Sequence, residues 1–275
     1  MSEDVPVPDQ IGPYRIIRLA GKGGYARVYL GEDKDGRPYA VKLHFRNRKK
    51  ALKRFYREFT ILSEQRYRSV PRAYQFGEKD GAPWMSMSWI PGETAITDVR
   101  AFGQAGSTTR IYRARRILIG VADALDYLHR QNILHCDIKP SNVLVQPNGS
   151  ITLVDFGAAR WMNQAAGVAE GIRFVGTRSY ASLELLTAKP TDPRSDLFSV
   201  GVMAYKLLTG RRPYKRGDAH TSVDVLLDAT PTPPAEWCPE ISRELSELVL
   251  ELMSLQAEKR PQSAAAVSQR LKQIP

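Results

Sequence analysis

The residue types that could do chemistry are concentrated in two short segments of this sequence. The first, residues 135–142, reads His-Cys-Asp-Ile-Lys-Pro-Ser-Asn, and the second, residues 155–157, reads Asp-Phe-Gly. Asp137 could accept the proton of a hydroxyl group, and Lys139 would place a cation where negative charge moves during phosphoryl transfer. Each segment alone is a weak signal, but their order and spacing together indicate metal-assisted phosphoryl transfer.

A predicted hairpin joins the two segments. Residues 143–145 and 151–154 are apolar and strand-like, and a Pro-Asn-Gly turn lies between them at 147–149. This arrangement brings Asn142 and Asp155 close together. An amide oxygen and a carboxylate that meet there suit Mg²⁺, which prefers oxygen ligands and leaves positions for phosphate.

A glycine-rich segment lies near the N-terminus. Residues 21–28 read Gly-Lys-Gly-Gly-Tyr-Ala-Arg-Val, between strand-like residues 14–19 and 28–30. Glycines let backbone amides approach phosphate oxygens without a β-carbon in the way. Taken alone, the glycines are equally consistent with an ordinary hairpin turn.

The next strand carries a candidate phosphate-binding lysine. Strand alternation places Ala40 and Lys42 on one face and Val41 on the other. Downstream, an apolar stripe at helical spacing includes Glu58 on its inward face. Its apolar members are Leu52, Phe55, Phe59 and Leu62. A carboxylate that points into a core needs a partner, so we expect Glu58 to pair with Lys42.

At 275 residues the chain is long enough to form two lobes, each with its own core. Two apolar helices are predicted in the C-terminal half, at 117–128 and 197–208, and charged residues within them argue against membrane spans. The two cysteines, Cys136 and Cys238, fit a reducing compartment, and the acidic, proline-containing N-terminus does not resemble a signal peptide. We therefore expect a cytoplasmic protein without a transmembrane segment.

The formal charge of +11 could indicate nucleic-acid or acidic-membrane binding. However, the basic residues are spread through predicted helices and are not interleaved with aromatic residues as in a stacking platform. The charge fits anionic ligands or an acidic protein partner better, so nucleic-acid binding is not expected. The sequence leaves the oligomeric state open.

With these motifs in place, the sequence resembles a eukaryotic-type Ser/Thr protein kinase catalytic domain, possibly a bacterial one, from residue 14 to about residue 271. Residues 135–142 resemble the family pattern HRDxxxxN, with Cys136 where the family usually has Arg. Residues 21–28 resemble GxGxxGxV, with Ala26 in place of the third glycine. Residues 176–184 resemble GTxxYxAPE, with Ser-Leu in place of Ala-Pro.

The resemblance implies an α+β, bilobal protein-kinase-like fold with a β-rich N-lobe, one regulatory helix and a mainly helical C-lobe. The expected boundaries are an N-terminal extension at 1–13, the N-lobe at 14–87, a hinge at 88–93 and the C-lobe at 94–275. It also implies ATP and Mg²⁺ as cofactors. The implied catalytic residues are Asp137, Lys139 and Thr177, and the implied metal ligands are Asn142 and Asp155. The implied nucleotide-binding residues are Gly21, Gly23, Gly24, Val28, Ala40, Lys42, Glu58, Met87, Ser88, Ile90 and Leu144.

The same resemblance implies that Glu184 pairs with Arg260 and that Asp196 supports the catalytic loop. The expected reaction is transfer of the ATP γ-phosphate to Ser or Thr hydroxyls of a protein substrate. Because Cys136 cannot bind a phosphate as Arg would, and residues 158–175 contain no Ser, Thr or Tyr, we expect activity without phosphorylation of this segment. The alternatives are a pseudokinase that only binds nucleotide and a small-molecule phosphotransferase.

Overall fold

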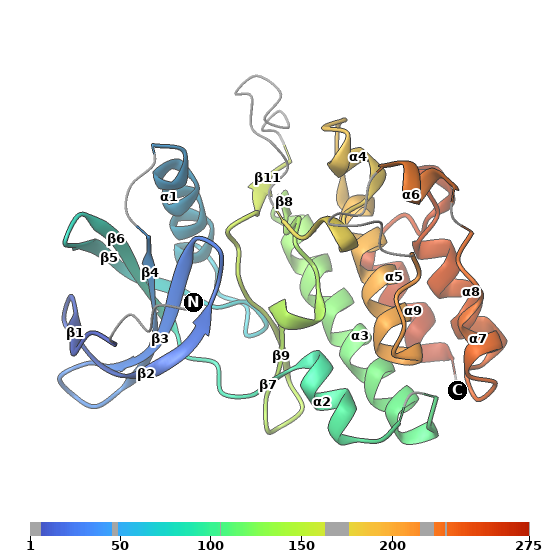
Figure 1. Ribbon diagram of the computed structural model, residues 1–275, viewed down its shortest axis with the longest axis horizontal. Coiled ribbons are helices and arrows are strands. Elements are labelled where there is room, and N and C mark those ends of the chain that lie inside the picture. The colour runs from blue at the N-terminus through green and yellow to red at the C-terminus, as the bar shows by residue number, and fades with distance from the viewer. Residues whose placement is uncertain are drawn as a thin grey trace, which may run out of the picture. The chain divides into compact units, whose positions relative to one another are not determined.

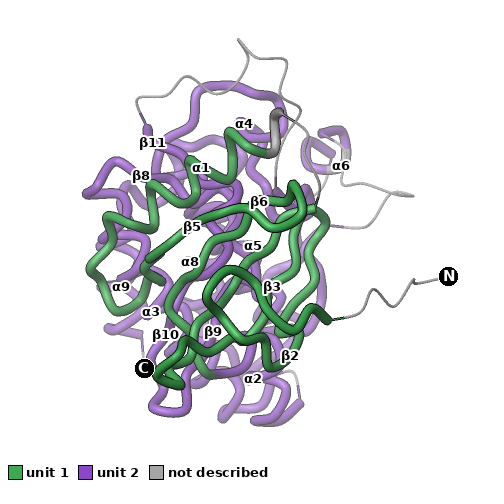
Figure 2. The backbone as a smooth tube through the Cα atoms, turned by 90° about the vertical axis from the view of Figure 1, so that its left-hand side faces the viewer, with its two compact units in different colours: residues 1–91 green, residues 92–275 purple. Residues whose placement is uncertain are grey.

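The structure is a computed structural model that describes residues 7–45, 49–104, 106–162, 176–214, 223–228 and 230–274. The chain divides into two compact units, residues 1–91 and 92–275 (Figure 2). The division lies inside the segment predicted as a hinge, residues 88–93. One unit is rich in strands and the other is mainly helical (Figure 1), as the predicted fold class requires.

The first unit is built on an antiparallel sheet of six strands in the order β1-β2-β3-β4-β6-β5. The strands are β1 (Gln10–Ile11), β2 (Tyr14–Lys22), β3 (Ala26–Glu32), β4 (Pro38–His44), β5 (Ala73–Lys79) and β6 (Ala82–Ser88). One helix, α1 (Lys49–Ser63), packs against β5 and β6. Two of its buried apolar side chains, Phe55 and Leu62, belong to the predicted stripe and hold the helix in place.

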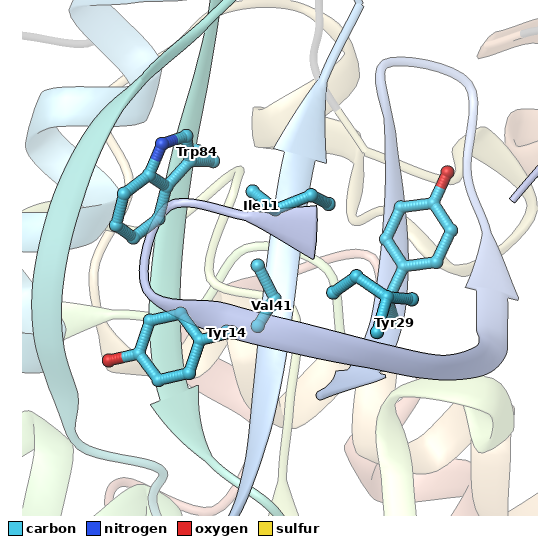
Figure 3. Close-up of a cluster of buried hydrophobic side chains, with 6 residues drawn as sticks. Ile11, Tyr14, Tyr29, Val41 and Trp84 are labelled. Atoms are coloured by element: carbon cyan, nitrogen blue, oxygen red, sulfur yellow. The ribbon is translucent and has the colours of Figure 1, made fainter. Parts of the chain in front are cut away.

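The two faces of this sheet differ because side chains alternate along each strand. Tyr29 and Val41 are ladder partners, and both belong to a buried cluster on one face. The cluster contains Ile11, Tyr14, Ile16, Tyr29, Val41 and Trp84, most of which are labelled in Figure 3. Lys42 follows Val41 in β4 and therefore belongs to the opposite face, as the alternation predicted.

Two residues of the segment predicted as an N-terminal extension, Gln10 and Ile11, form a strand of this sheet. These two residues form β1 and pair with Arg15 and Tyr14 of β2. Gly12 has a φ of 54°, a conformation that glycine adopts without a steric penalty, so the chain can reverse there. Ile11 is thereby fully buried in the cluster of Figure 3.

The second unit contains the longer helices and two small sheets. The helices are α2 (Ala95–Ala101), α3 (Thr108–Arg130), α4 (Leu183–Leu186), α5 (Pro193–Thr209), α6 (Val223–Asp228), α7 (Pro234–Trp237), α8 (Arg243–Leu252) and α9 (Ala264–Gln273). Helix α3 packs against α5 and α9, and α5 packs against α8 (Figure 1). Short 3₁₀ turns lie at η1 (Pro140–Asn142), η3 (Arg178–Tyr180) and η4 (Ala257–Lys259).

The helices α3 and α5 are longer than the predicted ranges 117–128 and 197–208, because capping residues extend them beyond their apolar cores. The Ser107 hydroxyl accepts from the Arg110 amide at the start of α3, and the Asp192 carboxylate accepts from the Arg194 amide at the start of α5. Gly210 ends α5 in a left-handed conformation.

The small sheets position the chemistry-bearing segments. Strands β9 (Val143–Val145) and β10 (Ile151–Leu153) form the predicted hairpin, and β7 (Glu93–Thr94) pairs with β9. Strands β8 (Ile133–Leu134) and β11 (Arg160–Trp161) pair with each other. In the part of the chain that the structure describes, no helix is both long and apolar enough to cross a bilayer.

Candidate active site

A buried ion pair joins the sheet of the first unit to its helix. Lys42 Nζ lies 2.6 Å from Glu58 Oε1, and both side chains are buried. The pair that strand alternation and helical spacing predicted is therefore confirmed. An enclosed carboxylate fixes the direction of the Lys42 ammonium, which can present its charge to a phosphate as a point cation.

Three other predicted nucleotide-binding residues share the face of Lys42. Val28 is the ladder partner of Lys42 in β3, and Ala40 precedes Lys42 by two residues in β4. Met87 is the ladder partner of Ala40 in β6 and is buried. Because ladder partners project to the same side of a sheet, the structure groups these side chains on one apolar surface that ends in a cation.

The glycine-rich segment forms the turn between β2 and β3. Gly21 is the second-to-last residue of β2, and the Gly23 amide donates to the Ala26 carbonyl at 2.8 Å. A β-carbon at Gly21 or Gly24 would meet nothing within 4 Å, and neither residue has a left-handed φ. The fold itself therefore does not require glycine at these two positions, whereas close approach of a phosphate would.

The predicted hinge residues continue from β6. Ser88 is the last residue of this strand, and its amide donates to the Arg72 carbonyl at 2.9 Å. Ile90 lies two residues beyond the strand, and both side chains are half-buried. The adenine contacts assigned to Ser88 and Ile90 by resemblance stay a prediction.

In the second unit, Asp137 lies at the centre of a dense hydrogen-bond network. Its Oδ2 accepts from Lys139 Nζ at 2.7 Å and from Asn142 Nδ2 at 3.0 Å. Its Oδ1 accepts from the Thr177 amide at 2.8 Å. Lys139 Nζ also donates to the Thr177 hydroxyl at 2.8 Å, so one ammonium connects Asp137 to Thr177. All three predicted catalytic residues therefore meet within one unit.

The metal-ligand prediction fits the hairpin geometry. The Val154 amide donates to the Asn142 carbonyl at 2.9 Å, which places Asp155 at the same end of the hairpin as Asn142. Asn142 Nδ2 donates to the Asp137 main chain and side chain, so the amide oxygen of Asn142 is its remaining acceptor. The side chain of Asp155 is exposed. These two oxygen donors suit Mg²⁺, which needs few protein ligands when phosphate supplies others.

The implied nucleotide-binding residue Leu144 is the middle residue of β9. It pairs with Thr152 of β10 and with Thr94 of β7, and it is half-buried. Lys42 and the glycines belong to the first unit, whereas Leu144, Asn142 and Asp155 belong to the second. The expectation that these residues act on one nucleotide stays a prediction.

Asp196, in α5, supports the segment that precedes Asp137. Its carboxylate accepts from the amides of His135 at 3.0 Å and Cys136 at 2.8 Å, which confirms the predicted support. Burial alone would raise the pKa of Asp196, but hydrogen bonds from His129 and the His135 amide outweigh burial and lower it. Burial lowers the pKa of the enclosed His135 imidazole, so this ring is neutral near pH 7.

The backbone is unusual at one residue of each chemistry-bearing segment. Cys136 has a φ of 61° and Asp155 a φ of 63°, in the left-handed region that residues with a side chain seldom occupy. Each such residue costs on the order of 1–3 kcal/mol, a cost that folded proteins retain mainly at functional sites. The Asp196 bond to the Cys136 amide helps to hold the first of these conformations.

A second ion pair joins Glu184, which is half-buried, to the buried Arg260. Arg260 Nη1 donates to Glu184 Oε1 at 2.7 Å, as the resemblance implied. Burial would raise the pKa of Glu184, but the bonds from Arg260 and the Ser195 hydroxyl lower it overall. Residues 163–175, which include most of the segment expected to need no phosphorylation, lie outside the described residues.

Sequence reasoning missed His129, whose Nε2 lies 2.9 Å from Asp196 Oδ2. His129 lies in α3, far from Asp196 in sequence, and no local pattern marked it. It also missed the packing around Cys136, which forms a buried apolar cluster with Leu134, Ala181 and Leu185. Four apolar residues from separate segments give no periodic signal.

The geometry of the two units is that of a protein kinase, and the chain belongs to the protein kinase domain family, whose model matches residues 14–271. Among curated relatives, it is 34% identical over 94% of its length to the serine/threonine-protein kinase pkn2 of Myxococcus xanthus. It is 29% identical over 96% of its length to the probable serine/threonine-protein kinase PknB of Bifidobacterium longum. It is also 27% identical over 97% of its length to the tyrosine-protein kinase MasK of Myxococcus xanthus.

The chain spans less than half the length of these relatives, since it covers 32% of pkn2, 40% of PknB and 44% of MasK. The likeness is therefore to their kinase domains.

Proposed function

We propose that this chain is an ATP-dependent Ser/Thr protein kinase that transfers the γ-phosphate of ATP to hydroxyl groups of protein substrates. The observation that carries the proposal is the network around Asp137, in which Lys139 bonds both to the Asp137 carboxylate and to the Thr177 hydroxyl. The relatives named above as Ser/Thr kinases support the substrate class.

Asp137 is the residue that would take the proton of the substrate hydroxyl. In the part of the chain that the structure describes, Oδ2 already accepts from Lys139 and Asn142, whereas Oδ1 accepts only from the Thr177 amide. A carboxylate oxygen has two lone pairs, so Oδ1 keeps one for the hydroxyl. The Lys139 ammonium stabilises the charge that develops on the transferring group.

Asn142 and Asp155 would hold Mg²⁺, which when bound neutralises charge on the ATP phosphates. In the first unit, Lys42 would bind phosphate oxygens, with its ammonium directed by Glu58. The amides of the Gly21–Gly24 turn would contact the phosphates, and Val28, Ala40 and Met87 would contact the base. Most of the rate enhancement would come from positioning and electrostatics, because these residues form no covalent intermediate.

The packing around Cys136 supports activity without phosphorylation of the segment after Asp155. In place of an arginine side chain, the Cys136 thiol is buried with Ala181 and Leu185. These two residues follow Thr177 closely in sequence. The apolar contacts would hold the Thr177 region against the catalytic loop without a phosphate, since burial of apolar surface needs no charged partner.

The replacement Asp155→Ala tests the proposal directly. We expect phosphate transfer to a generic protein substrate to fall by about a thousandfold or more, because a metal ligand acting on the phosphates is lost. Urea unfolding of the same preparation checks that the variant is folded, because residue 155 has a left-handed φ of 63° that alanine adopts at a cost. Transfer at the parent rate would show that Asp155 has no such role.

The two alternatives are separated by the same assay. A pseudokinase would bind ATP but leave no label on itself or on a protein when Mg²⁺ and labelled ATP are supplied. A small-molecule phosphotransferase would label small alcohols and leave proteins unlabelled. A dephosphorylated preparation that recovers activity only after phosphorylation of the segment 158–175 would contradict the expected regulation.

A further inference from the structure

A small pocket in the second unit combines an apolar wall with two cations. Its wall includes Tyr180, Val202 and Tyr214, and its polar lining includes Ser179, Lys206 and Arg212. Tyr180 and Tyr214 are largely enclosed, and burial raises the pKa of both phenols, which therefore stay neutral near pH 7. The two cations thus provide the formal charge of this lining.

Within the described ranges of the chain, no carboxylate neutralises these two cations. Lys206 Nζ donates to the Gly210 carbonyl, and neither Lys206 nor Arg212 has a carboxylate partner among the residues that the structure describes. Burial lowers the pKa of Lys206, and the charges of Arg212, Arg100 and Arg110 lower it further. A cluster of like charges around a half-buried ammonium is unfavourable, and an anion in the pocket would relieve it.

The pocket lies close to the proposed catalytic base. Ser179 and Tyr180 follow Thr177 by two and three residues, and the Thr177 amide bonds to Asp137 at 2.8 Å. Consecutive Cα atoms are about 3.8 Å apart, so the pocket wall is within roughly 12 Å of the residue that holds Asp137. An extended peptide covers this distance in about four residues.

We propose that Lys206 and Arg212 form a subsite for an acidic side chain of the protein substrate, within about four residues of the phosphorylated Ser or Thr. The inference rests on the proposed kinase function and specifies its substrate class. The apolar wall excludes water from one side of the bound anion, which strengthens its attraction to the two cations. The anion would be an Asp or Glu carboxylate, and a phosphorylated residue offers the same charge chemistry.

The test uses the full chain, Mg²⁺-ATP and a series of peptides that share one Ser acceptor. Glu replaces a neutral residue at each of the four positions before and after the acceptor, and matched peptides carry Lys or phosphoserine there. At one or more positions, we expect Glu to raise kcat/KM about tenfold over the neutral residue and Lys to lower it. Phosphoserine in place of Glu distinguishes a carboxylate preference from a need for prior phosphorylation.

The variant Arg212→Gln should remove most of the preference for Glu through KM, with little change in kcat for the neutral peptide. The matched control is Arg211→Gln, which removes the same charge from the neighbouring residue. The Arg211 guanidinium lies 3.9 Å from the centre of the Trp237 ring, outside the pocket lining. This control should keep the preference for Glu. Lys206→Met is a second test, and its folding is checked by urea unfolding because Lys206 also bonds to Gly210.

A charge reversal gives a result that structural damage cannot mimic. Arg212→Glu should weaken selection for the Glu peptide and improve the matched Lys peptide. Equal rates for neutral and acidic peptides in the parent chain, or equal losses in Arg211→Gln and Arg212→Gln, would refute the subsite while leaving the kinase function standing. If no peptide or protein receives phosphate from the parent chain, the kinase function and the subsite both fail.

Discussion

Each unit contains an ion pair with a side chain that is almost fully enclosed. The nitrogen–oxygen distance is 2.6 Å in the Lys42–Glu58 pair of the first unit and 2.7 Å in the Arg260–Glu184 pair of the second. The Lys42–Glu58 pair joins strand β4 to helix α1. Arg260 also donates to main-chain carbonyls of three further residues, Arg194, Ser254 and Leu255. The second pair therefore organises backbone as well as charge.

This difference indicates that the Lys42–Glu58 pair serves the chemistry of the site and that the Arg260–Glu184 pair stabilises the fold. Removing two charges from water is costly, and a buried pair recovers that cost only with good geometry and additional hydrogen bonds. Arg260 donates such bonds to three main-chain carbonyls, which an apolar replacement would leave without this donor. Lys42 lies on a sheet face that also carries the apolar side chains of Val28 and Ala40, beside which an apolar replacement can pack. We infer that the fold tolerates apolar replacement of the first pair better than of the second.

The double replacement Lys42→Met with Glu58→Leu tests the first half of this comparison. We expect phosphate transfer to fall by about a thousandfold, because the cation that binds phosphate is lost. The urea midpoint should stay within the equivalent of about 1 kcal/mol or increase, because an apolar pair of similar volume avoids the desolvation cost. Steady-state kinetics and urea unfolding of the same preparations measure both effects.

The control is the exposed pair Arg15–Glu32 of the same sheet, whose replacement by Met and Leu should change neither property much. A large loss of stability in the Lys42 and Glu58 variant, with the control unchanged, would show that the first pair is also structural.

The corresponding replacement in the second unit, Arg260→Met with Glu184→Leu, should destabilise the protein by about 3–5 kcal/mol, because three main-chain carbonyls lose their donor. The expected result is a clear fall in the urea midpoint, and lost activity would follow from unfolding. Replacing the exposed pair Arg243–Glu247 of α8 should have little effect. If the Arg260→Met, Glu184→Leu variant unfolds at the same urea midpoint as the parent chain, the inferred difference in stability between the two ion pairs is wrong.

How much could be predicted from sequence also differs between the units. In the first unit, the partners of Lys42 follow from strand alternation and helical spacing, which are local patterns. The strand at Gln10–Ile11 was not predicted, because two residues are too few to show alternation. In the second unit, the β9–β10 hairpin was also predictable from a local pattern, two apolar strand-like runs on either side of a Pro-Asn-Gly turn.

The supports of the catalytic loop were not predictable from local pattern. Asp196 and the amides of His135 and Cys136 are some sixty residues apart in sequence, and the Glu184–Arg260 pair is farther apart still. The family resemblance implied these contacts, whereas His129 had no signal of either kind. A side-chain bond to a distant backbone group is set by the tertiary fold, and neither periodicity nor composition encodes it.

The replacement Asp196→Asn tests the hydrogen bonds between Asp196 and the catalytic loop, and its expected effect on stability is smaller than that of the Arg260–Glu184 replacement. We expect a loss of about 2 kcal/mol at neutral pH, since an amide cannot accept all the bonds that the carboxylate accepts from the His135 amide, the Cys136 amide and His129. Because folding lowers the pKa of Asp196, its ionised form contributes stability fully above the unfolded value of about 3.9. That contribution is lost as the pH falls through the folded pKa.

The measurement is the difference in urea midpoint between parent and Asn variant at several pH values. The difference should be largest at neutral pH and shrink as the pH falls below about 4. Glu184 remains in both proteins, so its own titration cancels in the comparison. A difference that is independent of pH down to acid unfolding would show that the Asp196 charge adds nothing to the support.

The smallest effect is expected in the turn between β2 and β3, where Gly24→Ala should raise the KM for ATP about three- to tenfold by keeping phosphate away from the backbone. Stability should not change, because a β-carbon there meets nothing and φ is not left-handed. Gly36→Ala is the opposite case, since its φ of 76° makes alanine cost about 1 kcal/mol without touching ATP binding. ATP kinetics and urea unfolding of the two variants therefore distinguish Gly24, where glycine is needed for phosphate binding, from Gly36, where glycine is needed for the backbone conformation. An unchanged KM in Gly24→Ala would leave the β2–β3 glycines as an ordinary hairpin turn.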